Sequence, residues 1–257
     1  KTPCKIKGDS VAWLHLSGHC QNGYAHGQGR AESVDGLRHY SGGFTAGNFD
    51  GEGSYDWGNG VHYTGRFVRG AKTGRGTIVY PDNRKYAGDF KDNLYHGAGR
   101  YTEADGSVYE GAFSAGRFHG RGVYVWANGD KYTGQFRDDL MDGNGVYLRA
   151  NGESYAGQFS KNERNGAGTY HWPGGDRYVG AFRDNEINGE GTYYHADGTK
   201  YVGQFLNGKK QGWGRLLAAT GEFRQHWEQG QKIDEEKVPA TAESGTPQPV
   251  GTAVANQ

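Results

Sequence analysis

The chain has 257 residues, of which 47 are glycine and only one is methionine. A composition so rich in glycine argues against a conventional two-layer core. No apolar run approaches the roughly 20 residues of a membrane-spanning helix. The 29 Lys and Arg residues are interspersed with 29 Asp and Glu residues. The chain therefore lacks the basic stripe expected of a protein that binds nucleic acid or anionic lipid.

Residues 1–39 depart from the pattern that follows and predict an N-terminal cap. Within residues 1–15, Val11 and Trp13 predict a covering strand. Leu16-Ser17-Gly18-His19-Cys20 then predicts the first strand of a degenerate opening repeat, in which Cys20 takes a place that phenylalanine holds later in the chain. Atypical end repeats of this kind are expected where a repeat array must be capped.

The two cysteines of the chain are Cys4 and Cys20. They could be reduced thiols of a cytoplasmic protein, or they could pair and stabilise the fold by roughly 3 kcal/mol. We expect a disulfide, because both lie in the terminal cap, where an open sheet edge most needs fastening. The chain begins Lys-Thr-Pro without an initiator methionine. Together these features predict a periplasmic or secreted protein whose signal peptide has been removed.

Residues 40–223 contain eight copies of a 23-residue repeat without insertion. Each copy begins with Tyr-x-Gly-x-Phe, and glycine follows eleven, thirteen and usually twenty positions after the tyrosine, with a second tyrosine usually at fifteen. The repeat tyrosines are Tyr40, Tyr63, Tyr86, Tyr109, Tyr132, Tyr155, Tyr178 and Tyr201. An unbroken period of this length predicts stacked supersecondary units in one elongated domain.

The spacing within each repeat predicts two strands with an aromatic face. Tyrosine and phenylalanine four positions apart lie on one face of a strand, and the central glycine shares that face. Because glycine in a strand leaves a hollow, we expect a neighbouring ring to cover it, which makes most tyrosines core residues. Gly134, for example, lies between Tyr132 and Phe136.

Two kinds of tight turn are expected in each repeat. Asn-Gly and Asp-Gly pairs favour hairpin turns that need positive φ. Pairs such as Asp142-Gly143 and Asn165-Gly166 are expected to close the first strand, and pairs such as Asn128-Gly129 the second. In the second kind of turn Asn83 replaces glycine, and asparagine is the common substitute in the left-handed region.

The end of the chain departs from the repeat again. Phe223-Arg224-Gln225-His226-Trp227 resembles a first strand without its glycine, so residues 224–233 are expected to close the array. Residues 234–257 are small and polar and include Pro239, Pro247 and Pro249. This composition predicts a disordered tail or linker.

The motif Tyr-x-Gly-x-Phe followed by Gly-x-Gly-x-Tyr resembles the MORN (membrane occupation and recognition nexus) repeat, over about residues 16 to 227. The resemblance implies an all-β fold: a single-layer, elongated antiparallel β-sheet solenoid of about nine stacked 23-residue hairpin repeats. It also implies a binding, tethering or scaffolding module, here a bacterial secreted or periplasmic member, and no catalytic activity.

Motifs for chemistry are scarce in the sequence. The Gly-x-Gly pairs precede strands and not helices, so they do not suit phosphate-binding loops. His26, His96 and His119 recur at one repeat position, but repeats about 10 Å apart fit one zinc ion poorly, so a turn role is expected instead. We therefore predict that the protein is not an enzyme and has no cofactor or metal.

A candidate binding surface follows from aromatic residues seventeen positions after the repeat tyrosine. They are Trp57, Tyr80, Trp126 and Trp172. Exposed aromatic rows are rare unless they bind something, although these side chains could instead belong to the core. The hypotheses are a scaffold that binds a protein or peptide partner through this groove or an end strand, or a module that binds an envelope glycan. Phospholipid tethering and nucleic-acid binding are not supported by charge, and homodimerisation through an end strand remains open.

Overall fold

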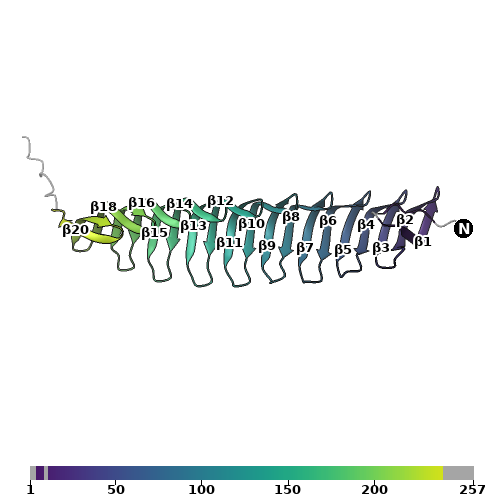
Figure 1. Cartoon of the computed structure of the whole chain (residues 1–257), viewed down its shortest axis with the longest axis horizontal. Helices are drawn as coiled ribbons and strands as arrows, with labels where there is room; N and C mark the ends of the chain where they lie inside the picture. The colour runs from purple at the N-terminus through teal and green to yellow at the C-terminus, as the bar shows by residue number, and fades with distance from the viewer. Residues whose placement is uncertain (1–3, 9–10, 240–257) are drawn as a thin grey trace, which may run out of the picture.

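The computed structural model describes residues 4–8 and 11–239, and the regular elements in them form one 20-stranded sheet (Figure 1). The strands are β1 (Trp13–Gln21), β2 (Tyr24–Ser33), β3 (His39–Thr45), β4 (Asn48–Asp56), β5 (His62–Val68), β6 (Ala71–Val79), β7 (Lys85–Lys91), β8 (Leu94–Thr102), β9 (Val108–Ser114), β10 (Arg117–Val125), β11 (Lys131–Arg137), β12 (Leu140–Leu148), β13 (Ser154–Ser160), β14 (Glu163–His171), β15 (Arg177–Arg183), β16 (Glu186–Tyr194), β17 (Lys200–Leu206), β18 (Lys209–Ala218), β19 (Gly221–Glu228) and β20 (Gln231–Lys237). Each strand pairs antiparallel with the next along the chain. The predicted all-β, single-layer antiparallel sheet is confirmed.

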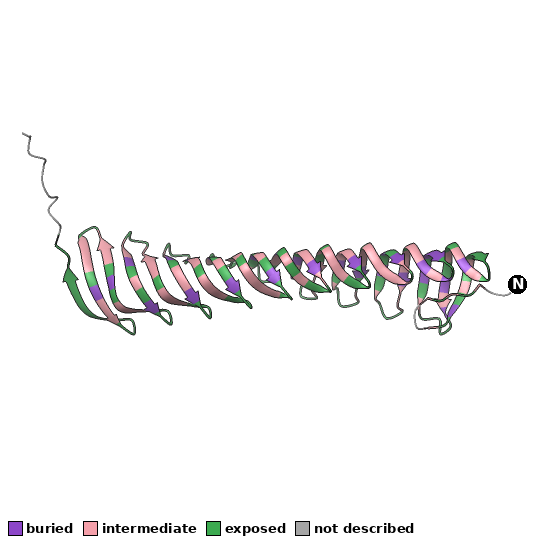
Figure 2. Cartoon of the chain, turned by 90° about the horizontal axis from the view of Figure 1, so that it is seen from above, coloured by how far each residue is buried: buried purple, intermediate pink, exposed green. Residues whose placement is uncertain are grey.

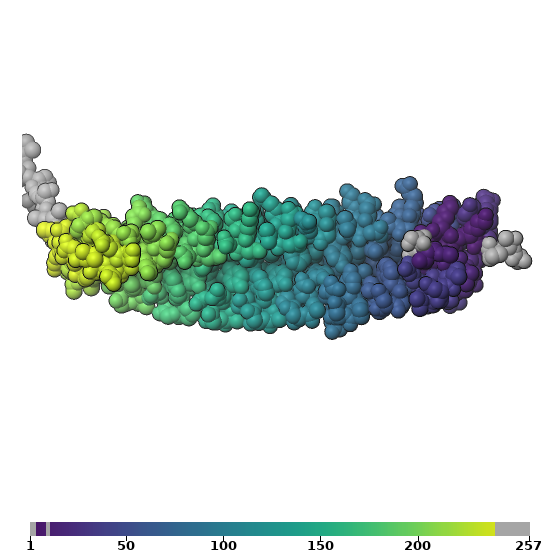
Figure 3. Space-filling model, viewed as in Figure 1, coloured from purple at the N-terminus to yellow at the C-terminus, as the bar shows by residue number. Residues whose placement is uncertain are grey.

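The sheet is a long rod whose strands lie across its long axis (Figures 1 and 3). Among the described residues, no helix is long and apolar enough to cross a membrane. The buried stretches recur at similar places in successive strands, and the turns between strands are exposed (Figure 2). The core is therefore a line of side chains that runs along the rod.

The 23-residue period places identical residues in continuous rows across the strands. Gly134 pairs with Gly122 on one side and with Gly145 on the other. In the same way Tyr132 pairs with Tyr124 and Tyr147. The predicted rows of glycine and aromatic residues are confirmed.

The glycine row allows the sheet to bend sharply. The rings of Tyr132 and Phe136 meet edge to face, with centroids 5.1 Å apart. In a flat strand, residues four positions apart would be about 13 Å apart. The Tyr132 ring folds back over Gly134, and its hydroxyl donates to the carbonyl oxygen of Gln135 at 3.0 Å. We call the face that carries these rings the inner face.

The hairpin turns that follow the first strand differ from the expectation. The turns lie at pairs such as Asp138-Asp139 and Lys161-Asn162, in which both residues have positive φ. The expected turn residue Gly143 lies inside β12 with φ of 105°, where the register with β11 shifts between Gly134 and Phe136. Glycine there permits a bulge and not a turn.

The turns that follow the second strand agree with the sequence. Gly129 has φ of 90°, and its N–H donates to the carbonyl of Trp126 at 2.9 Å. Asn83 adopts φ of 70° where other repeats have glycine. The prediction that asparagine replaces glycine in the left-handed region is confirmed.

The N-terminal cap is a strap and not the separate covering strand that was expected within residues 1–15. The N–H of Lys5 donates to the carbonyl of Gly23, and that of Lys7 to the carbonyl of Gly47, both at 2.8 Å. Gly23 and Gly47 belong to turns of successive hairpins. Residues 4–8 therefore run along the row of turns, and Lys5 makes an isolated parallel bridge with Tyr24 at the start of β2. The expected strand at Leu16–Cys20 is part of β1, which begins at Trp13.

The strap is fastened by the predicted disulfide. Cys4 and Cys20 are bonded, with Cα atoms 5.6 Å apart. Cys20 lies on the exposed part of β1, next to the turn that the strap crosses. The bond therefore joins the strap to the first strand of the sheet.

Reduction of this disulfide should loosen the cap by about 3 kcal/mol, because the bond closes a short loop in the unfolded segment. Repeats contact their nearest neighbours, so the loss should stay at the N-terminal end. Hydrogen exchange should then accelerate at the Ala25 amide, which donates to the carbonyl of Lys5 at 3.1 Å. Amides of β14 to β17 are the internal control. Unchanged exchange at Ala25 after reduction would contradict the fastening role.

At the other end the sheet extends beyond its expected limit. The segment 224–233 was expected to close the array, but β20 continues to Lys237 and pairs with β19 as far as Phe223. Every residue of β20 is exposed, so this strand adds no buried side chain to the sheet. Its Glu236 forms an ion pair with Arg224 of β19 at 3.3 Å. Disorder was predicted for residues 234–257, and this is wrong for residues 234–237, which belong to β20. Residues 240–257 of the predicted tail lie outside the described residues.

Candidate functional site

The inner face varies at one position in every repeat, nine residues after the repeat tyrosine. We call this residue the floor residue. The floor residues are Phe49, Lys72, Tyr95, Phe118, Met141, Arg164, Ile187 and Lys210. Where the floor residue is aromatic it stacks on the repeat tyrosine with centroids 3.9 Å apart, as Phe118 does on Tyr109. Aromatic floor residues therefore cover the repeat tyrosine, although a smaller hollow of about 290 Å³ lies beside Tyr95 and Phe118.

A hollow of about 420 Å³ opens where the floor residues are Met141 and Arg164. Tyr147 and Tyr170, the second tyrosines of these two repeats, form part of its lining, with Glu153 between them. Neither floor residue offers a ring to stack on its repeat tyrosine. The volume lies within the range of roughly 300–1,000 Å³ of small-ligand pockets.

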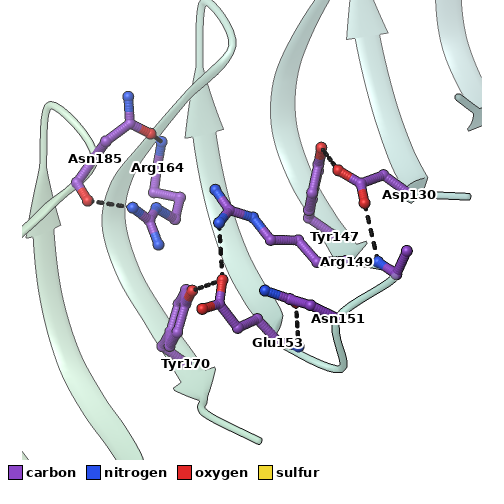
Figure 4. Close-up of polar contacts among 9 residues, drawn as sticks. Asp130, Tyr147, Arg149, Asn151, Glu153, Arg164, Tyr170 and Asn185 are labelled. Carbon is purple, nitrogen blue, oxygen red and sulfur yellow. Dashed lines mark hydrogen bonds and ion pairs between the residues drawn. The ribbon is translucent and has the colours of Figure 1, made fainter. Parts of the chain in front are cut away.

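Turn residues of the following repeat hold both floor residues in place, as Figure 4 shows for Arg164 and Asn185. The N–H of Arg164 donates to Oδ1 of Asn185 at 2.9 Å, and its Nη2 donates to the Asn185 carbonyl at 2.6 Å. The N–H of Met141 donates to Oδ1 of Asn162 at 2.7 Å. These bonds join consecutive repeats, so the floor of the hollow is fixed by the stacking of the turns.

The polar groups beside the hollow are hydrogen-bonded to one another (Figure 4). The Tyr170 hydroxyl donates to Glu153 at 2.7 Å, and Arg149 forms an ion pair with the same carboxylate at 2.8 Å. The Tyr147 hydroxyl donates to Asp130 at 2.9 Å. The hydrogen bond from Tyr170 lowers the pKa of Glu153, and burial raises the pKa of Tyr147 to about 12. Glu153 is therefore ionised and Tyr147 neutral at neutral pH.

Arg164 differs from Arg149 in having no acidic neighbour. Among the described residues, no carboxylate oxygen lies within 4.0 Å of its guanidinium. The guanidinium carbon lies 5.0 Å from the ring centroid of Tyr170 and 5.9 Å from that of Tyr155. The Arg164 guanidinium is thus held by cation–π contacts and by one hydrogen bond to Asn185. Its positive charge faces the hollow without a counterion.

The predicted surface residues Trp57, Tyr80, Trp126 and Trp172 all pack against the core from the inner face and are half-buried. Trp126 contacts Tyr147 with ring centroids 5.2 Å apart, and Trp172 contacts Tyr170 at 4.6 Å. These two tryptophans therefore flank the hollow, whereas Trp57 and Tyr80 lie in earlier repeats.

The row is also discontinuous, because Glu103, Arg149 and His195 occupy the same position in other repeats. Sequence reasoning missed Met141, Arg164, Arg149 and Glu153. A signal existed: three of the first four floor residues are aromatic, with Lys72 the exception, and none after Phe118 is.

Comparison with known families finds the MORN repeat in nine copies, at residues 18–38, 40–62, 63–83, 86–108, 109–131, 132–154, 155–177, 178–200 and 201–223. The matches cover the opening repeat and all eight regular repeats. The comparison with curated protein sequences finds no match.

Among solved structures, the chain is similar to the TCP domain of Drosophila melanogaster SAS-4 (dCPAP), solved in complex with a proline-rich motif of Ana2 (dSTIL). The two are 18% identical, the match covers 60% of this chain and 85% of that one, and the TM-score is 0.39. It is also similar to the TCP10 domain of Danio rerio CPAP, at 14% identity, 82% and 96% coverage and a TM-score of 0.32.

Proposed function

The chain belongs to the MORN repeat family, and from this membership we propose that it is a non-catalytic scaffold that binds an extended peptide segment of a partner protein along its inner face. The observation that carries the proposal is the inner face itself. It is lined by half-buried aromatic side chains and hollowed between Met141 and Arg164. Hollowed aromatic surfaces with a few fixed polar groups suit extended peptides.

The polar groups of this face support binding and not catalysis. Glu153 and Asp130 each accept a hydrogen bond from a tyrosine, and Arg149 pairs with Glu153. Side chains held in this way stay in one protonation state at neutral pH, whereas a general acid or base needs a pKa near the working pH. The Cys4–Cys20 disulfide supports the further proposal of an oxidising compartment, such as the periplasm or the cell exterior.

Replacement of Trp126 and Trp172 together by alanine should weaken partner capture at least 30-fold, because truncation of an interface hot spot costs about 2 kcal/mol or more. The measurement is recovery of cross-linked partner proteins on the immobilised full chain, with the folded state checked by circular dichroism.

A matched control lies on the opposite face. Trp213 precedes Gly214, over which the inner Tyr201 ring lies, so its side chain points outward and is 43% exposed. Trp213→Ala should leave capture unchanged. Equal losses in both variants would contradict the inner-face site, and capture of glycans in place of proteins would favour the carbohydrate alternative.

A further inference from the structure

The first regular repeat shows what kind of group fits the inner face. Trp13 of β1 is only 9% exposed, because its ring lies against Phe49 and Tyr55. The ring centroids are 5.2 Å and 5.6 Å apart, and both contacts are edge to face. The cap thus places an aromatic side chain from outside the repeat onto the inner face.

The positions that hold Trp13 recur at the hollow. Phe49 is a floor residue and Tyr55 is the second tyrosine of the same repeat. Their counterparts are Arg164 and Tyr170, both of which line the hollow. Because the repeats share one backbone register, a ring that enters the hollow meets the same two positions that Trp13 meets.

The charge of the hollow adds a second requirement. Arg149 is neutralised by Glu153, whereas Arg164 has no carboxylate within ion-pair distance in the described part of the chain. The other cationic floor residues, Lys72 and Lys210, also lie over aromatic rings. A ligand that supplies a carboxylate beside its ring would therefore complement the floor.

We propose that the hollow between Met141 and Arg164 binds an aromatic side chain of the partner, with an acidic residue next to it that pairs with Arg164. This inference rests on the proposed peptide-binding function and names the chemistry of the bound segment. The aromatic ring takes the place that Trp13 takes in the first regular repeat, and the carboxylate supplies the counterion that Arg164 lacks.

The chain provides a reporter for this test. Met141 lines the hollow and is the single methionine of the sequence. Protein labelled with ¹³C at the methionine methyl group gives one resonance for the chain, which an incoming aromatic ring shifts. The probes are the capped tripeptides Asp-Trp-Asp, Asp-Ala-Asp and Asn-Trp-Asn, added to the protein of residues 1–257.

Asp-Trp-Asp should shift the Met141 signal in a saturable way, and Asp-Ala-Asp should not. Asn-Trp-Asn should bind on the order of tenfold more weakly, and so should Asp-Trp-Asp to the Arg164→Gln protein, because each lacks one charge-assisted pair. Arg183→Gln, which removes an exposed arginine of β15, is the control and should bind normally.

Equal shifts from Asp-Ala-Asp, or full affinity in Arg164→Gln, would overturn the inference. A shift produced only by phosphatidylglycerol vesicles would overturn it in favour of a lipid headgroup. If partner capture depends on Trp126 and Trp172 but no tripeptide moves the Met141 signal, the proposed function stands and this pocket assignment fails. If the tripeptide binds as expected but capture is insensitive to the tryptophans, the proposed function fails instead.

Discussion

Gly134→Val should lower the free energy of unfolding by about 3 kcal/mol or more, because the site has no room for any side chain. A Cβ atom at this position would lie 2.4 Å from the Tyr132 hydroxyl and 2.6 Å from the Cα of Gly145. The tyrosine ring could move only by giving up its contact with Phe136, and the Gly145 backbone belongs to the paired strand. The measurement is chemical denaturation followed by tyrosine fluorescence.

Thr133→Val is the matched control for this substitution. Thr133 is the neighbouring residue on β11, and its side chain is exposed on the opposite face. Thr133→Val introduces the same residue at an exposed position, so it should alter the free energy of unfolding by less than about 0.5 kcal/mol. Similar midpoints for the two variants would show that the glycine row is not the tightly packed line that bends the sheet.

The sequence was sufficient to predict the rows but not the path of the chain between them. Strand side chains alternate with a period of two, so the spacing of Tyr132, Gly134 and Phe136 places all three on one face. The bend could not be predicted from that spacing, because it depends on the Tyr132 ring folding over its own strand.

The position of the turn after the first strand of each repeat was predicted wrongly, because hairpin turns and β-bulges favour the same residues. Asp142-Gly143 has the composition of a hairpin turn, yet the positive φ of Gly143 serves a bulge. The actual turn at Lys161-Asn162 begins with lysine, which carries no turn signal. Its second residue, asparagine, does tolerate a left-handed conformation and could have indicated the turn.

The candidate site was predictable only in part. The aromatic residues seventeen positions after the repeat tyrosine include Trp126 and Trp172, and both flank the hollow. The hollow itself is lined by side chains of two neighbouring repeats, and which of them meet depends on the register of β11 to β14. In the sequence Arg164 is one of many dispersed charges; its hydrogen bonds to Asn185 place it in the hollow.

Trp13→Ala should lower the stability of the N-terminal end by about 3–5 kcal/mol, the usual loss when a buried tryptophan is truncated. The Trp13 ring fills the inner face above Phe49 and Tyr55, and a Cβ at Gly8 of the strap would lie 2.4 Å from its Nε1. Truncation therefore removes contacts with both the first regular repeat and the strap. Hydrogen exchange should accelerate in β1 to β4.

Leu14→Ala tests whether this loss comes from the inner face. Leu14 is adjacent in β1, points to the other face and is 48% exposed, so its truncation should cost less than about 1 kcal/mol. Because repeats contact only their neighbours, β14 to β17 should exchange normally in both variants. Equal effects of the two substitutions would mean that Trp13 stabilises the edge strand only through the apolar surface that it buries, and not through its contacts on the inner face. A large effect confined to Trp13→Ala would show that the inner face gains stability from an aromatic ring supplied from outside the repeat, which is the same interaction that we expect a partner to make at Arg164.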